Sequence, residues 1–445
     1  MAARLRNPVT QTNPWGLTQT LYIQNDDHTD WTVQETSGTL STASTDGVYG
    51  EAVVQFDVAA TDNGKLQAAV TDDATNHYTN GMFTRLIKIN DFTKLVDTDW
   101  YLFPNTGSYR SSGVFVAATA ELADDNEWFL WQQLGNTMAE AGAPGDFDDN
   151  TTPLDLMSLW SESTGSGLIV QYGAIYGNVR HDKARIIISA DDSNDTDYTV
   201  FYEELKARGL KGQIYAIPSL QGDSARTTWA QLQEMQDSSY ISVGTHGSTN
   251  LTTLTYTQAT DDLITNRDLM IANGDFDWQH YSYPEGDYNL ESQDALEVVG
   301  YRTARTTKVN GAGDAPFPYV LSQGLNLYTG TGFNLTLTRT GDTTYDLTAF
   351  QTAYDEIIAK GLVAELYVHR IQATVTAGSG HTHTACFTDV LDILAASVAA
   401  GDIEVVHKAD LYEAATGLGS TAATSGFDIL DNLNNDAGFA AIFGD

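Results

Sequence analysis

A run of apolar residues ends in two acids at positions 185–192, RIIISADD. Three consecutive isoleucines between polar residues are typical of a strand buried on both faces, as strands of parallel sheets are. The next segment, 198–208, has the apolar spacing of a helix and stops at Gly209, a residue that favours a helix C-terminus. A second strand is predicted at 213–217, so the order here is strand, helix, strand.

The same order repeats through the C-terminal half of the chain. The further predicted strands are 241–245, 280–283, 301–305, 362–369 and 404–407. The further predicted helices are 229–235, 258–272, 292–299, 349–360, 389–399 and 409–415. Repeated strand-then-helix order implies a parallel sheet, and about seven such units imply a barrel over residues 180–417. The segment 306–348, rich in Thr, Gly and Asn, is predicted to be an insert without a strand of its own.

Residues 1–179 have a different pattern. Short runs of β-branched and aromatic residues, such as 52–58 and 83–89, alternate with clusters of Gly, Asn, Asp and Ser. About eight short strands without a strong helical segment favour a β-sandwich of jelly-roll type. Segment 138–153 is the longest predicted loop, and residues 418–445 are predicted to form an acidic C-terminal tail.

The charge of the chain excludes several classes of partner. The 445 residues include 22 Lys+Arg and 59 Asp+Glu, which gives a formal net charge of −37. We expect no nucleic-acid binding, because contact with phosphate needs a basic face. We expect no membrane insertion, since no apolar run approaches the ~18–20 residues that a membrane helix needs. The one cysteine, Cys386, excludes an internal disulfide and multi-cysteine metal sites.

The balance among the charged residues carries further information. The chain has 43 aspartates, 16 glutamates and nine lysines. Few lysines and many aspartates are typical of proteins adapted to high salt, where screening reduces the repulsion among the acids. We therefore predict a halophilic protein from a hypersaline or marine source. The alternative is an ordinary acidic surface that keeps the protein soluble.

Polar residues follow the ends of several predicted strands. Asp191 and Asp192 end the first strand, and His246 and His369 end two later ones. In a parallel barrel the working groups sit where strands end and loops begin, so we expect these side chains to converge on one rim. Glu285, in a tight turn after another strand, either joins this rim or is simply solvated. The alternatives are that the aspartates cap a helix and that His246 is a buried core histidine.

Four short motifs resemble those of the polysaccharide deacetylase family, carbohydrate esterase family 4. The family motif T-F-D-D-G corresponds to Ser189-Ala190-Asp191-Asp192-Ser193, and H-[ST]-x-x-H corresponds to His246-Gly247-Ser248-Thr249-Asn250. The motif R-x-P-[YF]-G corresponds to Ser282-Tyr283-Pro284-Glu285-Gly286, and the late leucine–histidine motif to Tyr367-Val368-His369. The resemblance implies a distorted (β/α) barrel behind the jelly-roll-like β-sandwich. It also implies removal of acetyl groups from N-acetylated sugars with a divalent metal, for which zinc is expected.

The resemblance also implies a role for each matching residue. Asp191 is expected to be the base that activates water, and His369 the acid that protonates the leaving amine. Asp192, His246 and Asn250 are expected to bind the metal. Amide hydrolysis needs these functions, because it requires an activated water, a Lewis acid on the carbonyl and a proton for the nitrogen.

Three positions depart from the family pattern. Asn250 stands where the family has a second metal-binding histidine, Ser282 where it has the arginine that orients the base, and Ser193 where it has a glycine. Asparagine is a weaker zinc ligand than imidazole, so we expect weakened or altered activity. The pair His381 and His383 in a later loop either completes a metal site or belongs to a polar surface loop.

Three functions remain open from the sequence. The first is a metal-dependent deacetylase that acts on a host or environmental polysaccharide, with a β-sandwich that binds glycan or docks the enzyme. The second is a catalytically inactive glycan-binding protein that keeps the barrel. The third is a structural part of a larger assembly. A fold alone does not choose between such functions.

The biological setting is predicted from the N-terminal sequence. Residues 1–15 contain two arginines but no apolar stretch after them, so we expect no signal peptide. Because glycan-directed proteins normally work outside the cell, we predict a component of a virus particle, such as a tail fibre or spike used for host attachment. Other virion proteins are then expected partners, and we expect a homo-oligomer. Leaderless secretion and a cytoplasmic location are the alternatives.

Overall fold

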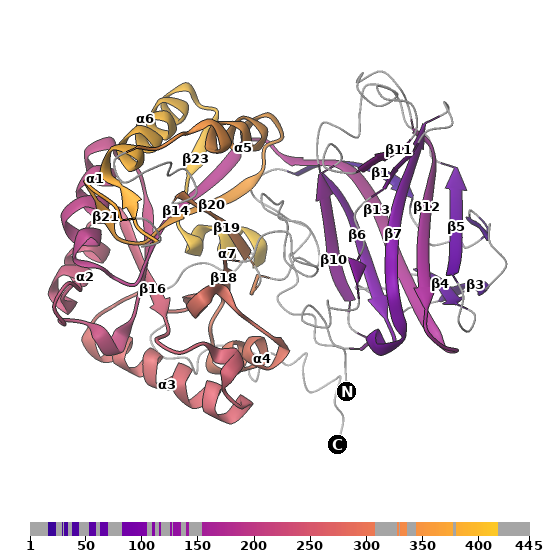
Figure 1. Cartoon of the computed structure of the whole chain (residues 1–445), viewed down its shortest axis with the longest axis horizontal. Coiled ribbons are helices and arrows are strands. Elements are labelled where there is room, and N and C mark those ends of the chain that lie inside the picture. Colours follow the sequence, from indigo (N-terminus) through magenta and orange to yellow (C-terminus); the bar gives the residue numbers. More distant parts are fainter. Residues whose placement is uncertain are drawn as a thin grey trace, which may run out of the picture.

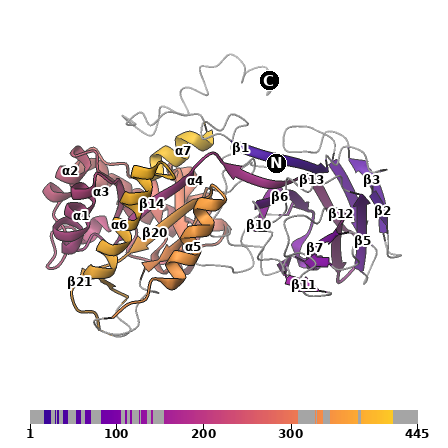
Figure 2. The ribbon, with the colours of Figure 1, turned by 90° about the horizontal axis from the view of Figure 1, so that it is seen from above.

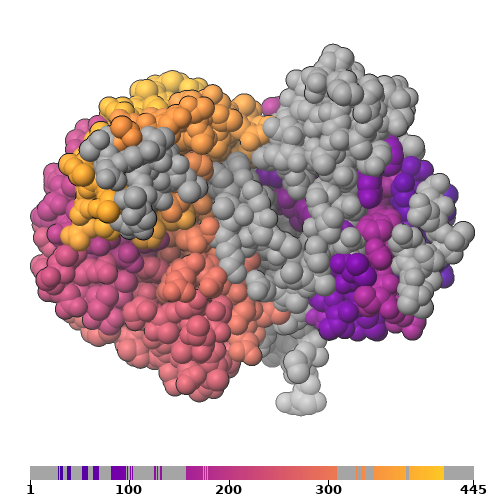
Figure 3. All heavy atoms as spheres, in the orientation of Figure 1, coloured from indigo at the N-terminus to yellow at the C-terminus, as the bar shows by residue number. Residues whose placement is uncertain are grey.

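The chain forms two lobes that lie side by side (Figure 1). The computed structural model describes residues 17–23, 29, 31–33, 38–43, 53–58, 63–69, 82–104, 109–111, 115–116, 125–126, 128–134, 139–141, 154–307, 327–328, 330–335, 344–376 and 380–416. Figure 3 shows the same two lobes as atoms, the β lobe from indigo to magenta and the α/β lobe from magenta to yellow. Within these ranges, no helix has both the length and the apolar character needed to cross a bilayer.

The N-terminal lobe contains two antiparallel sheets. The first sheet has the order β10 (Trp128–Leu134), β6 (Met82–Ile89), β13 (Leu168–His181), β4 (Val53–Val58) and β3 (Gly38–Ala43), and β1 (Leu17–Ile23) also pairs with β13. The second sheet has the order β11 (Ala139–Ala141), β8 (Tyr109–Ser111), β7 (Leu95–Pro104), β12 (Leu154–Ser163), β5 (Asn63–Ala69) and β2 (Trp31–Val33), and β9 (Phe115–Val116) also pairs with β7.

One apolar core joins the two sheets. Alternate residues of β4 are fully buried, and Phe56 from this strand belongs to the same cluster as Leu66 and Leu159 from the second sheet. Between the sheets, the hydroxyl groups of Ser161 and Tyr172 lie 2.7 Å apart in a buried hydrogen bond. The inner faces of the two sheets thus pack against each other, as in a β-sandwich.

The C-terminal lobe is a barrel of parallel strands. Its strands follow the order β14 (Ala184–Asp191), β15 (Gly212–Ala216), β16 (Ile241–His246), β17 (His280–Ser282), β18 (Thr303–Thr306), β19 (Gly330–Asn334) and β20 (Val363–Val368). Because β14 pairs with both β15 and β20, these described strands close a ring. The first residues of β14 also pair with β23 (Ile403–Val405), which lies outside the ring. Every residue of β14 is buried, as its isoleucine run predicts.

Helices lie outside the ring of strands (Figure 1 and Figure 2). They are α1 (Glu203–Arg208), α2 (Trp229–Asp237), α3 (Tyr256–Asn273), α4 (Leu290–Val299), α5 (Thr348–Ala359), α6 (Thr384–Ala400) and α7 (Lys408–Thr416). Thr228 and Thr255 open α2 and α3 with reciprocal side chain–backbone hydrogen bonds. Gly209 and Gly401 end α1 and α6 with φ of 66° and 85°, where glycine is favoured.

The prediction of an insert without a strand over 306–348 is wrong at one point. β19 lies in this segment and fills the gap between β18 and β20. Its sequence, GTGFN, does not indicate a strand, because glycine and asparagine are depleted in strands. A Cβ at Gly332 would lie 2.8 Å from a ring carbon of Tyr367 and 3.2 Å from Cδ of Arg305. The glycine therefore reflects crowding inside the barrel.

A short link joins the two lobes. β13 ends at His181, and β14 begins at Ala184, so only two residues lie between these strands. The backbone N–H of His181 donates to the carbonyl of Gly361 at 2.9 Å, at the start of β20. Gly361 has a φ of 56°, and a Cβ there would lie 2.2 Å from the His181 carbonyl oxygen. Only glycine fits this contact between sandwich and barrel.

The predicted fold class, a β-sandwich followed by a (β/α) barrel, is confirmed. The boundary between residues 179 and 180 stays a prediction, although antiparallel and parallel strands meet close to it, at residues 182 and 183. β11 occupies part of the predicted loop 138–153, and most of the rest of that loop lies outside the described residues. The predicted acidic tail, 418–445, also lies outside them.

Candidate functional site

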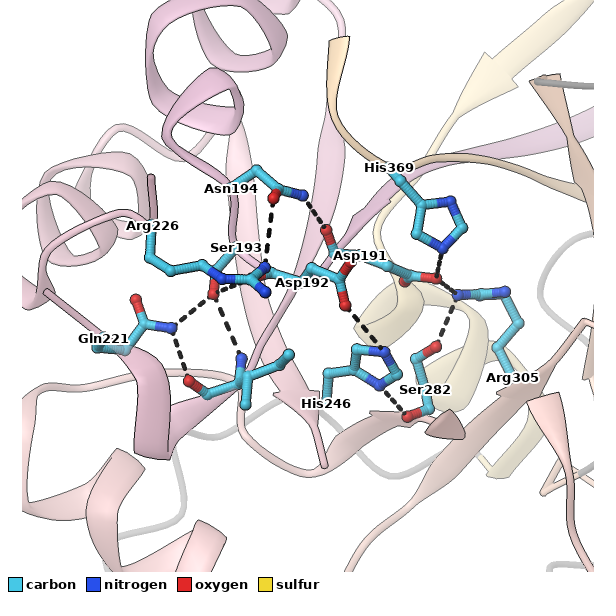
Figure 4. Close-up of polar contacts among 11 residues, drawn as sticks. Asp191, Asp192, Ser193, Asn194, Gln221, Arg226, His246, Ser282, Arg305 and His369 are labelled. Carbon is cyan, nitrogen blue, oxygen red and sulfur yellow. Dashed lines mark hydrogen bonds and ion pairs between the residues drawn. The ribbon is translucent and has the colours of Figure 1, made fainter. Parts of the chain in front are cut away.

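The carboxyl ends of the barrel strands bring the predicted side chains together on one rim. Asp191 ends β14, His246 ends β16, and His369 directly follows β20. Figure 4 shows these side chains and Asp192 turned toward one another, with Ser282 from the end of β17 beside them. The strand-end pattern of the sequence therefore predicts this gathering correctly.

Asp191 lies at the centre of the rim. Its side chain is 3% exposed, and its Oδ2 forms an ion pair with Arg305 and lies 3.8 Å from Nε2 of His369. Burial opposes ionisation of this carboxyl, but the positive charge of Arg305, aided by the histidines, keeps its pKa below the ordinary value. The other oxygen, Oδ1, is buried and has no hydrogen-bond partner among the described residues. Buried carboxylate oxygens are normally bonded, so Oδ1 is available to a group from outside the chain.

Arg305 lies in the barrel interior, and the motifs of the sequence do not predict its role. Its side chain is fully buried, its Nη2 donates to Oγ of Ser282 at 2.6 Å, and its Nε lies 3.3 Å from Oε1 of Glu365. Oε2 of Glu365 accepts from Nζ of Lys408 at 2.6 Å. The four charged groups, which include Asp191, alternate in sign and sum to zero, as buried ions require. Arg305 is the last residue of a predicted strand, so the strand-end rule could have found it.

Asp192 and His246 face each other across the rim. Oδ1 of Asp192 lies 3.5 Å from Nε2 of His246. Nδ1 of His246 lies 2.7 Å from the backbone carbonyl oxygen of Ser282. Because a carbonyl only accepts, Nδ1 donates to it, and Nε2 is the ring nitrogen that faces Asp192. A histidine supported in this way through its other nitrogen is the common arrangement at metal sites.

These two side chains fit two ligand positions of a divalent cation. Two ligands about 2.1 Å from a tetrahedral zinc lie about 3.4 Å apart. The 3.5 Å between Oδ1 of Asp192 and Nε2 of His246 is close to that value. Among the described residues, no group of three or more His, Cys, Asp or Glu side chains is arranged to hold a metal. Asp192 and His246 are therefore the two side chains whose spacing would suit a divalent cation.

Asn250, the third expected ligand, makes other contacts. Its Oδ1 accepts from the backbone N–H of Thr252 at 3.0 Å, and its Nδ2 donates to Glu285 and Asp287, both at 2.9 Å. Carboxylates accept and a backbone N–H donates, so these partners fix the orientation of the amide. Asn250 thereby caps the short helix Leu251–Thr253, and Glu285 is exposed beside it.

His381 and His383 lie on the loop after β20. This loop contains a two-stranded sheet, β21 (Ile371–Gln372) with β22 (Thr382–His383). His383 is buried at the start of α6, and Nδ1 of His381 lies 3.1 Å from Oε1 of Gln372. Neither belongs to a cluster of three metal-binding side chains in the part of the chain that the structure describes. The completion of a metal site by this pair stays a prediction.

The loop after β14 has an unusual backbone. Asp192 and Ser193 have φ of 74° and 49°, a left-handed conformation that glycine adopts without strain. Oγ of Ser193 accepts from the backbone N–H of Ile217 at 3.3 Å and from Nε2 of Gln221 at 2.5 Å. Nη1 of Arg226 donates to the carbonyl of Asp192 at 2.6 Å. These bonds stabilise a serine at the position where the family pattern has glycine (Figure 4).

Comparison with known proteins adds to this geometry. Residues 178–304 match the family model described as polysaccharide deacetylase. The match covers the strands that carry Asp191, Asp192 and His246, whereas His369 lies beyond it. No curated protein sequence matches the chain.

Several solved structures are similar to parts of the chain. The Streptococcus pyogenes deacetylase PplD in complex with acetate is 24% identical, with 27% of this chain and 55% of that chain covered and a TM-score of 0.26. A putative polysaccharide deacetylase from Mycobacterium smegmatis is 10% identical, with 55% and 95% covered and a TM-score of 0.40. The family 11 carbohydrate-binding module from Clostridium thermocellum, in complex with a β-1,3-1,4-mixed-linked tetrasaccharide, is 12% identical, with 36% and 95% covered and a TM-score of 0.27.

The hydroxyl of Ser193 gives a test of the loop after β14. We expect Ser193→Ala to lower the free energy of unfolding by about 1–3 kcal/mol, because the buried N–H of Ile217 loses its acceptor. Ser193→Gly loses the same hydroxyl but relieves about 1 kcal/mol of backbone strain, so it should cost less. Urea unfolding measures both variants. Wild-type stability of Ser193→Ala would contradict the assigned role of the hydroxyl.

Proposed function

We propose that this chain, whose residues 178–304 match the polysaccharide deacetylase family model, hydrolyses N-acetyl groups of a glycan with the help of a divalent cation. The state of Asp191 is the observation that supports this most. It is a buried carboxylate, kept ionised by Arg305, with one oxygen free of hydrogen bonds. Such a base, beside a histidine and a pair of metal-binding side chains, meets the requirements of amide hydrolysis.

In the proposed reaction, the chain supplies a base and an acid. Oδ1 of Asp191 accepts a proton from a water molecule whose oxygen forms a bond to the acetyl carbon. Nε2 of His369, on the other side of Asp191, donates a proton to the amide nitrogen as the C–N bond breaks. The products are acetate and a free amine on the sugar. A cation bound by Asp192 and His246 supplies a Lewis acid for the acetyl carbonyl.

A second function is supported by the contacts of Asn250. Its amide oxygen accepts from the backbone of Thr252, which leaves two protein donors where the family pattern has three. A site with fewer protein ligands binds a cation more weakly, and without the cation the barrel would bind glycan without turning it over. The two functions differ in acetate release and in metal content, and both can be measured.

The first test is acetate release. We expect the protein, assayed in high salt with added zinc, to release acetate from soluble N-acetylglucosamine oligomers. Asp191→Asn should lower kcat/KM about 100- to 10,000-fold, because it removes the general base. Asp223→Asn, an exposed acid on the loop 221–227, is the matched control and should change nothing. Glycan binding without acetate release from the wild type would favour the second function.

The second test is the metal content of the rim. We expect about one zinc per chain in calorimetric titration, as a two-donor site implies, and a loss of binding in Asp192→Asn and His246→Gln. Asn250→Ala should keep zinc binding, because the amide oxygen of Asn250 accepts from Thr252. Loss of zinc in Asn250→Ala would instead assign Asn250 as a ligand. No zinc binding by the wild type would contradict the proposed role of a cation in the reaction.

We also propose that the protein acts as an oligomeric host-attachment component of a virus particle. The acidic composition and the pairing of a β-sandwich with a glycan-directed barrel support this proposal. Because most protein assemblies are symmetric homo-oligomers, we expect sedimentation equilibrium in high salt to give a multiple of the 48.3 kDa chain mass. A monomer at all concentrations would count against the proposal.

A further inference from the structure

We propose that Arg305, on β18, positions the base Asp191. In the family pattern this role belongs to an arginine at position 282, which lies on the neighbouring strand β17. The inference rests on the proposed function, because it treats Asp191 as the base. Arg305 touches no reacting atom in this scheme, so it is a positioning residue.

The register of the barrel strands supports this exchange. Ser282 on β17 and Arg305 on β18 are paired partners in the parallel ladder. Side chains at paired positions of parallel strands lie at the same level on the same face of the sheet. The backbone of an arginine at 305 therefore lies at the same height below the rim as that of an arginine at 282, but on the next strand of the barrel.

The contacts of the guanidinium reach back across that one strand. Nη2 of Arg305 donates to Oγ of Ser282 at 2.6 Å and also forms the ion pair with Oδ2 of Asp191. Figure 4 shows Arg305 and Ser282 on the same side of Asp191. The short side chain at 282 thus leaves room for the guanidinium and adds a hydrogen bond to it.

The residue on the other side of Arg305 is also small. Gly332 on β19 has no Cβ, and a Cβ there would lie 3.2 Å from Cδ of Arg305. Ser282 and Gly332 therefore clear space on both flanking strands.

Further contacts fix the guanidinium in place. Its carbon lies 4.2 Å from the ring centre of Tyr367, and its Nε lies 3.3 Å from Oε1 of Glu365. Glu365 is itself bonded to Nζ of Lys408 at 2.6 Å and to the hydroxyl of Tyr215 at 3.2 Å. Because each neighbour is buried, the guanidinium is held on every side, and its contact with Asp191 is to Oδ2 and not to Oδ1.

The experiment compares three variants with the wild type. Arg305→Ser removes the guanidinium, and Arg305→Lys keeps the positive charge but not the planar set of N–H donors. The double variant Ser282→Arg with Arg305→Ser returns the arginine to position 282, where the family pattern has it. We measure kcat and KM for acetate release from N-acetylglucosamine oligomers, and the thermal midpoint of each variant. Arg302→Lys, three residues earlier and stacked on Tyr412, is the control.

A positioning role predicts a specific pattern. Arg305→Ser and Arg305→Lys should lower kcat by roughly 10- to 100-fold with little change in KM, because binding is kept and the base is misplaced. The double variant should regain a large part of kcat, and Arg302→Lys should match the wild type. A folded Arg305→Ser variant with wild-type kcat, or a loss that follows the thermal midpoint alone, would overturn the inference.

Failure of the proposed function gives a different result. If the wild type releases no acetate, the double-mutant cycle of Asp191→Asn and Arg305→Ser is measured by unfolding. Strongly non-additive stability losses would support the pairing of Arg305 with Asp191, and additive losses would overturn it.

Discussion

The buried ion pair between Asp191 and Arg305 is the interaction on which the site depends. Removing an ion from water costs several kcal/mol even inside a relaxed protein, so neither charge is stable there without the other. The pair in turn needs Glu365 and Lys408, which complete a neutral set of charges. These four residues come from β14, β18, β20 and the start of α7, so the electrostatics of the site are shared by the whole barrel.

The geometry around this pair separates two kinds of departure from the family pattern. Ser193 and Ser282 are accommodated, because the first is bonded in its left-handed conformation and the second supports both His246 and Arg305. Asn250 is different, because its contacts draw it toward Glu285 and Asp287. The contacts that position Asp191, the proposed base, are therefore in place, whereas Asn250 is held away from the proposed cation.

Much of the fold and part of the site can be predicted from the sequence. The isoleucine run of β14 and the acids at its end are predicted from the local sequence. A continuous apolar run indicates burial on both faces, and the change to polar residues marks the end of the strand. β19 and Arg305 have no such signal. Gly332 of β19 is crowded by Tyr367 and Arg305, which lie far from it in the sequence, and the importance of Arg305 follows from its pairing with Ser282 across the ladder. The contacts of Asn250 depend on a loop 35 residues away in the sequence.

The link between the lobes has a mechanical consequence. Only residues 182 and 183 separate the last strand of the sandwich from β14, and Nη1 of Arg185 bonds to Asp182 at 2.5 Å and to the carbonyl of Lys183 at 2.6 Å. A connection this short and cross-bonded acts as a stiff joint. Any force on the sandwich would pass through these two residues into the backbone of β14, the strand that ends in Asp191.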